Sequence, residues 1–209
     1  MQLKDMTVST FLETLGSDAP APGGGSASAL MGALGAALST MVASLTVGKE
    51  KYGEHEALME EIIRKGWALR VQLTDVMDRD TEAFHGVTAV FSMPRGTEEE
   101  KAARKMAMQA ALKACTRTPY EMMECSLAVL ELAARALGRS NTNAASDLGV
   151  AALSLKAAIQ GAWLNILINL GGIQDEDFVR QYREGGELIL EKTLPLADHI
   201  YQTVLTELS

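Results

Sequence analysis

The sequence predicts an all-α fold: a single domain over residues 1–209, built as an up-and-down-like bundle of seven or eight helices and assembled as a homodimer. Apolar residues recur at steps of three or four, the period of a buried helix face, and alternating strand patterns are absent. Hydrophobic residues make up 47% of the chain but aromatic residues only 5%, so small side chains let helices pack closely. Helices this apolar also indicate that a second copy of the chain covers some of them.

The segment 20–48 is the element around which the other helices are expected to pack. It opens with the loop Pro20-Ala-Pro-Gly-Gly-Gly-Ser26, and no charge follows until Lys49. Residues 27–47 are apolar or small on every side, which predicts a buried helix with Ser26 as its N-cap. The backbone N–H groups of the glycine loop are then free to face a binding site.

A membrane-spanning helix is the alternative for residues 27–47, because about 20 apolar residues can cross a bilayer. The run is dominated by Ala, Gly and Ser, and it has neither an aromatic belt nor a flanking basic cluster. It also contains Ser39, Thr40, Ser44 and Thr46. We therefore expect the central helix of a soluble protein.

The helices on either side of this segment are predicted from caps, breakers and periodicity. A short first helix over Val8–Leu15 is capped by Thr7 or Ser9 and stopped by Gly16. After the loop 48–53, a long helical pattern runs from His55 to Ser92, just before a proline.

Two capping boxes predict two successive helices in the second half of the chain. Thr97-Glu-Glu-Glu100 opens a helix to about Arg117, and Thr118-Pro-Tyr-Glu121 opens another that ends at Gly138. The remaining helices are expected from the polar entry Ser140–Asp147 to Leu170, then over Asp175–Lys192 and Leu196–Leu208, divided near Gly185-Gly186 and Pro195.

Composition limits the classes of function. The net charge of -8 argues against nucleic acid as a general partner. The first nine residues are polar, so no signal peptide is expected, and two cysteines, Cys115 and Cys125, are expected to be reduced thiols in a cytoplasmic protein. The three histidines are scattered without a metal-ligand spacing, so no metal site is expected.

Asp80 is the residue that departs most clearly from its helical pattern. A carboxylate stands on the apolar stripe of the helix 55–92, where the spacing requires an apolar side chain, whereas Asp75 and Asp78 lie off the stripe and are expected to be solvated. Burial raises the pKa of a carboxyl group, which suits proton transfer near neutral pH. The stripe residues are Leu69, Leu73, Val76, Phe84, Val87 and Phe91.

A narrow polar stripe follows the helix that ends at Leu170. At about 100° per residue, Asp147, Ser154, Gly161 and Asn165 fall close to one line over roughly 27 Å, and Asn169 is one turn beyond. Asp147 is a second catalytic candidate. The alternatives are that Asp147 only serves the helix N-terminus and that the two asparagines bond across a helix–helix contact.

Several basic residues could meet the anionic end of a ligand in this acidic protein. Lys49 and Lys51 flank the loop beside Tyr52, and Arg104 lies in a later helix. The alternative for the two lysines is that they complement the negative end of the preceding helix.

Taken together, these stretches resemble the cyclodeaminase/cyclohydrolase family of tetrahydrofolate enzymes. The resemblance implies a helical homodimer with a folate site in the groove between subunits, and it places Asp80 at the family's acidic catalytic position. The matching segments are Pro20–Ser26, Val47–Tyr52, Asp78–Phe84, Met93–Glu100 with Arg104, Asn143–Leu148 and Gly161–Asn169.

The expected function is conversion of formimidoyltetrahydrofolate to methenyltetrahydrofolate with release of ammonia. The first alternative is a methenyltetrahydrofolate cyclohydrolase, in which the same carboxylate could activate water. The second alternative, of another class, is a non-enzymatic helical interaction protein. We expect no cofactor beyond the tetrahydrofolate substrate, and neither nucleic acid nor membrane as a partner. The expected catalytic residues are Asp80 and Asp147, and the expected substrate-binding residues are Gly23, Gly24, Gly25, Ser26, Lys49, Tyr52, Arg104, Asn165 and Asn169.

Overall fold

The computed structural model describes residues 2–209, which form six α-helices and three short 3-10 helices without a strand. The all-α prediction is therefore confirmed for these residues. The elements are η1 (Leu3–Asp5), α1 (Val8–Leu15), α2 (Gly24–Ser44), η2 (Glu50–His55), α3 (Glu56–Phe91), α4 (Glu98–Ala136), η3 (Thr142–Ala144), α5 (Ala145–Leu170) and α6 (Glu176–Leu208).

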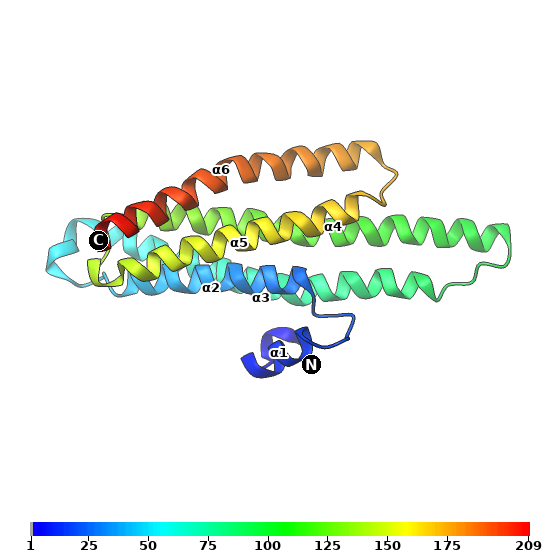
Figure 1. The fold of residues 1–209 in the computed structure, drawn as a ribbon, viewed down its shortest axis with the longest axis horizontal. Helices are drawn as coiled ribbons and strands as arrows, with labels where there is room; N and C mark the ends of the chain where they lie inside the picture. Colours follow the sequence, from blue (N-terminus) through cyan, green and yellow to red (C-terminus); the bar gives the residue numbers. More distant parts are fainter. Residues whose placement is uncertain (1) are drawn as a thin grey trace.

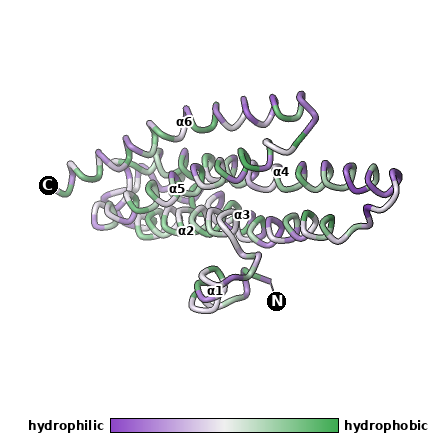
Figure 2. The backbone as a smooth tube through the Cα atoms, turned by 45° about the vertical axis from the view of Figure 1, so that its right-hand side comes forward, coloured by the Kyte–Doolittle hydropathy of each residue, from purple (hydrophilic) through white to green (hydrophobic). Residues whose placement is uncertain are grey.

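Helix α2 is the centre of the bundle, as its composition predicts. It packs against α3, α4 and α5, and α6 covers α4 and α5. Figure 1 shows α1 lying beside the bundle near the start of α2, and α3 and α4 extending beyond the other helices as a hairpin. Figure 2 shows hydrophilic residues gathered at the turn of this hairpin. The start of α2 thus lies part-way along the long helices, next to the base of the hairpin.

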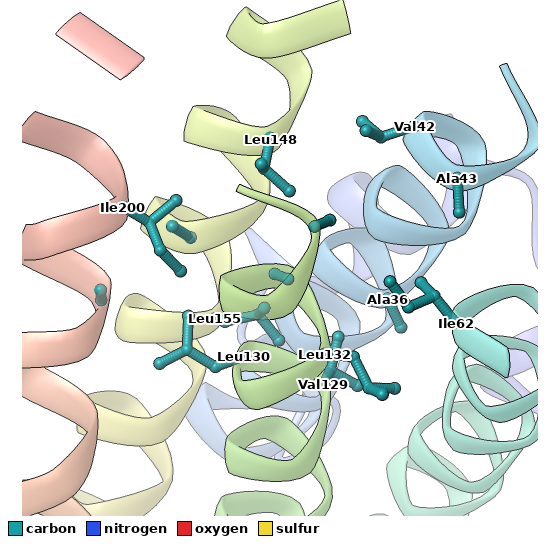
Figure 3. Close-up of a cluster of buried hydrophobic side chains, with 14 of the residues drawn as sticks. Ala36, Val42, Ala43, Ile62, Val129, Leu130, Leu132, Leu148, Leu155 and Ile200 are labelled. Atoms are coloured by element: carbon teal, nitrogen blue, oxygen red, sulfur yellow. The ribbon is translucent and has the colours of Figure 1, made fainter. Parts of the chain in front are cut away.

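The core combines small residues of α2 with larger aliphatic residues of its neighbours. Ala36 and Ala43 of α2 are completely buried, which lets the surrounding helices approach closely. The main cluster lies in the half of the bundle away from the hairpin, and Figure 3 shows its side chains, which come from helices α2 to α6. Its labelled members are Ala36, Val42, Ala43, Ile62, Val129, Leu130, Leu132, Leu148, Leu155 and Ile200.

Helix α4 is continuous through Pro119, so the prediction of a new helix at Thr118 is wrong. A proline lacks the N–H that would bond to the carbonyl four residues earlier, here that of Cys115. The side chain of Asn169 on α5 supplies the missing donor, with Nδ2 lying 2.8 Å from the Cys115 carbonyl oxygen. A contact between helices therefore replaces the hydrogen bond that the proline removes.

Helix α6 is also continuous, so the predicted breaks near Gly185-Gly186 and Pro195 are wrong. The two glycines allow a close approach of helices: a Cβ at Gly186 would lie 2.6 Å from Trp163 Cε3, and one at Gly185 3.1 Å from Tyr120 Cζ. Pro195 is exposed, where water can satisfy the carbonyl that loses its partner. These two continuous helices reduce the predicted seven or eight helices to six.

The predicted helix starts are correct at two positions and wrong at a third. Thr7 caps α1 by accepting a hydrogen bond from the backbone of Thr10, and Thr97 and Glu100 form the predicted capping box of α4. Ser26 does not cap α2, because the helix begins two residues earlier with Gly23 as its N-cap.

Two helices, α2 and the η3–α5 segment, are long and apolar enough to cross a membrane by length and composition alone. The apolar window of α2 is 61% buried inside the protein, as expected of a core helix, whereas that of the second is 39% buried. The uncovered part of α5 is an exposed apolar stripe that bears on assembly.

Candidate active site

A cavity of about 380 Å³ lies at the start of α2, where the loop before it meets α3, α4 and α5. It brings together seven of the predicted site residues: Gly23, Gly24, Gly25, Ser26, Asp80, Asn165 and Asn169. The other lining residues are Pro20, Ala21, Thr81, Phe84, Leu112, Cys115 and Ile168.

The glycines at the start of α2 allow the Asp80 carboxylate to approach the helix end. A Cβ at Gly25 would lie 2.7 Å from Asp80 Cγ, closer than real side chains come, whereas one at Gly23 would meet nothing within 4 Å. The first intrahelical bond is donated by Ala27 to Gly23, so the N–H groups of the first helical turn have no partner within the helix. These donors and the positive end of the helix dipole favour negative charge here.

Asp80 is partly buried and receives a weak hydrogen bond from Thr118, whose Oγ1 lies 3.4 Å from Asp80 Oδ1. Burial raises its pKa from 3.8 to about 6, against the opposing effect of the Thr118 and Ser26 hydroxyl groups. None of the ion pairs within residues 2–209 includes Asp80. The carboxylate can therefore gain and lose a proton near neutral pH, and it is available to a cationic ligand.

Asn165 and Asn169 form the opposite wall, as the polar stripe on α5 predicts. Asn165 lies against the loop, since a Cβ at Gly24 would be 3.6 Å from its Nδ2. Asn165 Nδ2 donates to the Gly161 carbonyl at 2.8 Å, and Asn169 Nδ2 donates to the carbonyls of Asn165 and Cys115, both at 2.8 Å. The alternative that these asparagines bond across a helix–helix contact is thus also realised, by the bond from Asn169 on α5 to Cys115 on α4.

Three contacts fix the segment of α3 that carries Asp80. Arg79 donates two hydrogen bonds to Glu121 on α4, at 2.8 and 2.6 Å. Asp78 accepts a hydrogen bond from the backbone of Leu3, and Asp75 pairs with Lys4 at 2.6 Å. The expectation that Asp75 and Asp78 are merely solvated is therefore wrong, because they anchor the N-terminal segment beside the cavity.

The structure does not bring Lys49, Tyr52 or Asp147 to this cavity. Lys49 and Tyr52 follow the far end of α2, a helix of 21 residues that is about 30 Å long. Tyr52 is buried, and hydrogen bonds with the side chain of Thr142 at 3.3 Å and from its backbone N–H at 3.1 Å lower the pKa of the Tyr52 hydroxyl to about 8. Asp147 lies in the first turn of α5, at the same distant end.

Arg104 lines a second hollow, of about 340 Å³, between the ends of α3 and α4. Its Nε donates to the Val90 carbonyl at 3.0 Å, which ties the two helices together. Val90 is ten residues beyond Asp80 on α3, or about 15 Å along the helix axis. Arg95, Lys101 and Lys105 line the same hollow, so a group of four cations lies within reach of a ligand that extends from the cavity.

Sequence reasoning missed two residues that shape the environment of Asp80: Cys115, which lines the cavity, and Thr118, which contacts the carboxylate. Thr118 was interpreted as a helix cap because it precedes a proline, but its hydroxyl faces Asp80. No sequence pattern around Cys115 indicates a place in the site. Burial, together with the Asp80 charge, raises the pKa of the Cys115 thiol to about 11, so the thiol is a poor nucleophile. Among residues 2–209, no three His, Cys, Asp or Glu side chains are grouped so as to hold a metal ion.

A helical bundle with a partly buried carboxylate in a small, largely apolar cavity that holds a few polar groups is the class of structure that supports acid–base chemistry on a small molecule. Comparisons with known proteins agree. A family model described as formiminotransferase-cyclodeaminase matches residues 7–187. A methenyltetrahydrofolate cyclohydrolase from Methylorubrum extorquens is 40% identical over 203 residues, covering 97% of this chain and 98% of that protein.

Two further relatives extend the comparison. Formimidoyltransferase-cyclodeaminase from Rattus norvegicus is 33% identical over 191 residues, which cover 91% of this chain but only 35% of the rat protein. The crystal structure of a formiminotetrahydrofolate cyclodeaminase from Thermotoga maritima is similar with a TM-score of 0.83 at 29% identity, covering 99% of this chain and 98% of that one. The chain belongs to the formiminotransferase-cyclodeaminase family of folate one-carbon enzymes.

Proposed function

We propose that this protein is a methenyltetrahydrofolate cyclohydrolase, with Asp80 as its general base. The observation that carries the proposal is a carboxylate without an ion-pair partner among residues 2–209, held at the edge of the cavity with a pKa of about 6. The methenyl group is cationic, so it would supply the counter-charge that Asp80 lacks. The relative with 40% identity over nearly its whole length bears this activity in its name.

A single proton carrier, Asp80, is sufficient for the proposed reaction. Water attacks the methenyl carbon and gives one proton to Asp80, which forms a neutral tetrahedral intermediate. The bond from this carbon to one ring nitrogen then breaks, and Asp80 returns its proton to that nitrogen. The hydroxyl group of the intermediate loses its proton to solvent and becomes the formyl carbonyl, so one proton is released overall.

Cyclodeamination of formimidoyltetrahydrofolate is the second candidate, favoured by the fold match to the Thermotoga maritima enzyme over 99% of this chain. Here a folate nitrogen attacks the carbon of the protonated formimidoyl group, and Asp80 accepts the proton of the attacking nitrogen. The departing amino group receives this proton and leaves as ammonia, which gives the methenyl cation. The two reactions share the methenyl compound and the same carboxylate, so one cavity can serve either.

A pair of assays on the purified protein distinguishes the candidates. We expect loss of methenyltetrahydrofolate with formation of the formyl compound, and slower or no release of ammonia from formimidoyltetrahydrofolate. Faster ammonia release would favour cyclodeamination. If neither substrate reacts, and folates do not raise the melting temperature, the enzymatic proposal fails and the helical interaction protein becomes the better explanation.

The four cations at the hairpin provide a place for the glutamate tail of the folate. Arg104 on α4 is bonded to Val90, which lies about 15 Å along α3 from Asp80, so a ligand whose one-carbon group is at Asp80 can extend its tail toward the hairpin. Lys101 is already paired with Glu98 at 2.7 Å, so Arg95, Arg104 and Lys105 are the stronger candidates.

The homodimer remains a proposal, and an exposed apolar stripe on α5 supports it. Leu164 is 67% exposed and Ile168 is 78% exposed, and Val150 and Leu153 continue the stripe along the same helix. Ile168 also lines the cavity, so a second copy that covers the stripe would border the cavity mouth. In an antiparallel pairing, the distant end that bears Lys49, Tyr52 and Asp147 would come from the second copy.

The proposed reaction uses no cofactor beyond the tetrahydrofolate substrate, and it needs no membrane or nucleic acid. We propose a cytoplasmic location on the same ground, since one-carbon folates are soluble and the family members are enzymes that act on them.

A further inference from the structure

The orientation of the two asparagine side chains on α5 is determined by their hydrogen bonds. Asn169 Nδ2 lies 2.8 Å from two carbonyl oxygens, those of Cys115 and Asn165. Asn165 Nδ2 lies 2.8 Å from a third, that of Gly161. Turning either amide around would place an oxygen against carbonyl oxygens, which is repulsive. Both N–H groups of the Asn169 amide and one of the two of Asn165 are therefore committed to the protein.

The amide oxygens of the same two residues are the groups left for a ligand. No hydrogen bond to Oδ1 of Asn165 or Asn169 is formed within residues 2–209, and both residues line the cavity. They are one helical turn apart on α5, or about 6 Å along its axis. The α5 wall of the cavity thus offers two hydrogen-bond acceptors beside one N–H of Asn165, and it favours a ligand edge that presents N–H groups.

The position of these acceptors relative to Asp80 gives the ligand a direction. Gly24 packs against Asn165 and Gly25 packs against Asp80, so the start of α2 lies between the two walls. A ligand across the glycine loop would place its reacting carbon near Asp80 and its N–H groups near α5. The reduced pterin ring of a folate has such an edge, formed by its 2-amino group and the neighbouring ring N–H.

We propose that the amide oxygens of Asn165 and Asn169 accept hydrogen bonds from the 2-amino edge of the folate ring and so determine which end of the ring enters the cavity. This inference rests on the proposed function. Pro119 contributes indirectly, because the unpaired Cys115 carbonyl that it leaves holds the Asn169 amide in the orientation that turns its oxygen to the ligand. Asn165 is the more direct test, since its own NH₂ bonds only within α5.

The experiment compares two ligands on two proteins. Tetrahydrofolate and its 2-desamino-2-methyl analogue, which replaces the donor with a methyl group, are titrated into the wild type and into Asn165→Leu. We expect the wild type to bind the analogue about 10-fold more weakly, as when a buried acceptor loses its partner. Asn165→Leu is expected to bind both ligands within about twofold of each other.

The controls separate this inference from the proposed function. Gln181→Leu changes an exposed amide side chain on α6, outside the residues that line the cavity, and is expected to keep the full preference for tetrahydrofolate. Asn165→Asp keeps an acceptor and is expected to keep the preference even if Asn165→Leu folds poorly. Equal binding of both ligands by the wild type, or an undiminished preference in Asn165→Leu, overturns the inference while the proposed function stands. If the wild type binds neither ligand, both fail.

Discussion

Replacing Asp80 by asparagine is expected to raise stability and abolish most activity, and the two effects have one cause. The carboxylate is partly buried without an ion-pair partner among residues 2–209, and its pKa is raised from 3.8 to about 6. A group whose pKa is raised on folding contributes stability below its unfolded pKa, and that contribution is lost as the pH rises through the folded value. Wild-type stability should therefore fall between about pH 4 and pH 6.

The size of this loss follows from the pKa. Two pKa units correspond to about 3 kcal/mol, and the partial exposure of Asp80 reduces this to about 2 kcal/mol. Asparagine keeps the shape of the side chain without the charge, so the variant should be about 2 kcal/mol more stable than wild type at pH 8 and nearly equal to it at pH 4. For a chain of 209 residues, this is roughly 4–8 °C in melting temperature.

Turnover should move in the opposite direction. General acid–base groups contribute about 10²–10⁴-fold in rate, so kcat of Asp80→Asn should fall by that factor while folate still binds. In the wild type, kcat/KM should fall about tenfold per pH unit below pH 6, because the base is then protonated. This acidic limb should be absent from any residual activity of the variant.

The measurements are thermal melts at pH 4 and pH 8, at one protein concentration, beside turnover of methenyltetrahydrofolate. Asp18→Asn, which changes an exposed carboxylate, is the control and should alter neither melting temperature nor turnover. A melting difference for Asp80→Asn that is the same at both pH values would refute the argument from burial. A folded variant with near-normal turnover would remove Asp80 from the mechanism and make Asp147 the next candidate.

Three further changes test the cavity, the tail site and the assembly. Gly25→Ala should displace the Asp80 carboxylate and lower kcat at least 10-fold, as in the loss of a positioned acid–base group. Gly23→Ala, whose new Cβ would meet open space, should have a kcat near that of wild type. Equal effects of the two changes would argue against the close approach of Asp80 to Gly25. Arg104→Ala should weaken binding of polyglutamylated folate about 3–10-fold more than that of the monoglutamate, with Lys49→Ala as the comparison at the far end of α2; equal losses for both ligands would exclude a tail site. Leu164→Glu should convert a dimer to monomers in light scattering, and a wild-type protein that is already an active monomer would contradict the proposed assembly.

Local patterns in the sequence were sufficient for most of the fold. Apolar periodicity and capping residues gave the helical class, the central position of α2 and the starts of α1 and α4, because these depend on neighbouring residues. The same local rules predicted a false helix start at Thr118, since the Asn169 side chain that repairs the Pro119 break comes from 50 residues further along the chain. Local rules cannot supply a donor from another helix.

The candidate site also contains residues that local patterns predict and residues whose position depends on distant parts of the fold. Asp80 could be predicted because a charge on an apolar stripe is visible within one helix, and Asn165 and Asn169 because they break a second apolar helix. Lys49 beside Tyr52 was predicted as a basic edge for an anionic ligand, but the length of α2 places both residues far from the cavity, and the local pattern does not convey that distance. Their role now depends on how two copies of the chain are placed relative to each other.

The bond between Asn169 and Cys115 also has a consequence for how the chain folds. Without α5, the second half of α4 would begin at a proline with an unsatisfied carbonyl one turn earlier, so α4 alone should be frayed at that point. Helix α4 becomes one rigid rod of 39 residues only after α5 has docked. The folding of α4 around Pro119 thus depends on the docking of α5 at the cavity wall. Hydrogen exchange of the backbone amides around residues 115–119 should therefore report the docking of α5 rather than the local stability of α4.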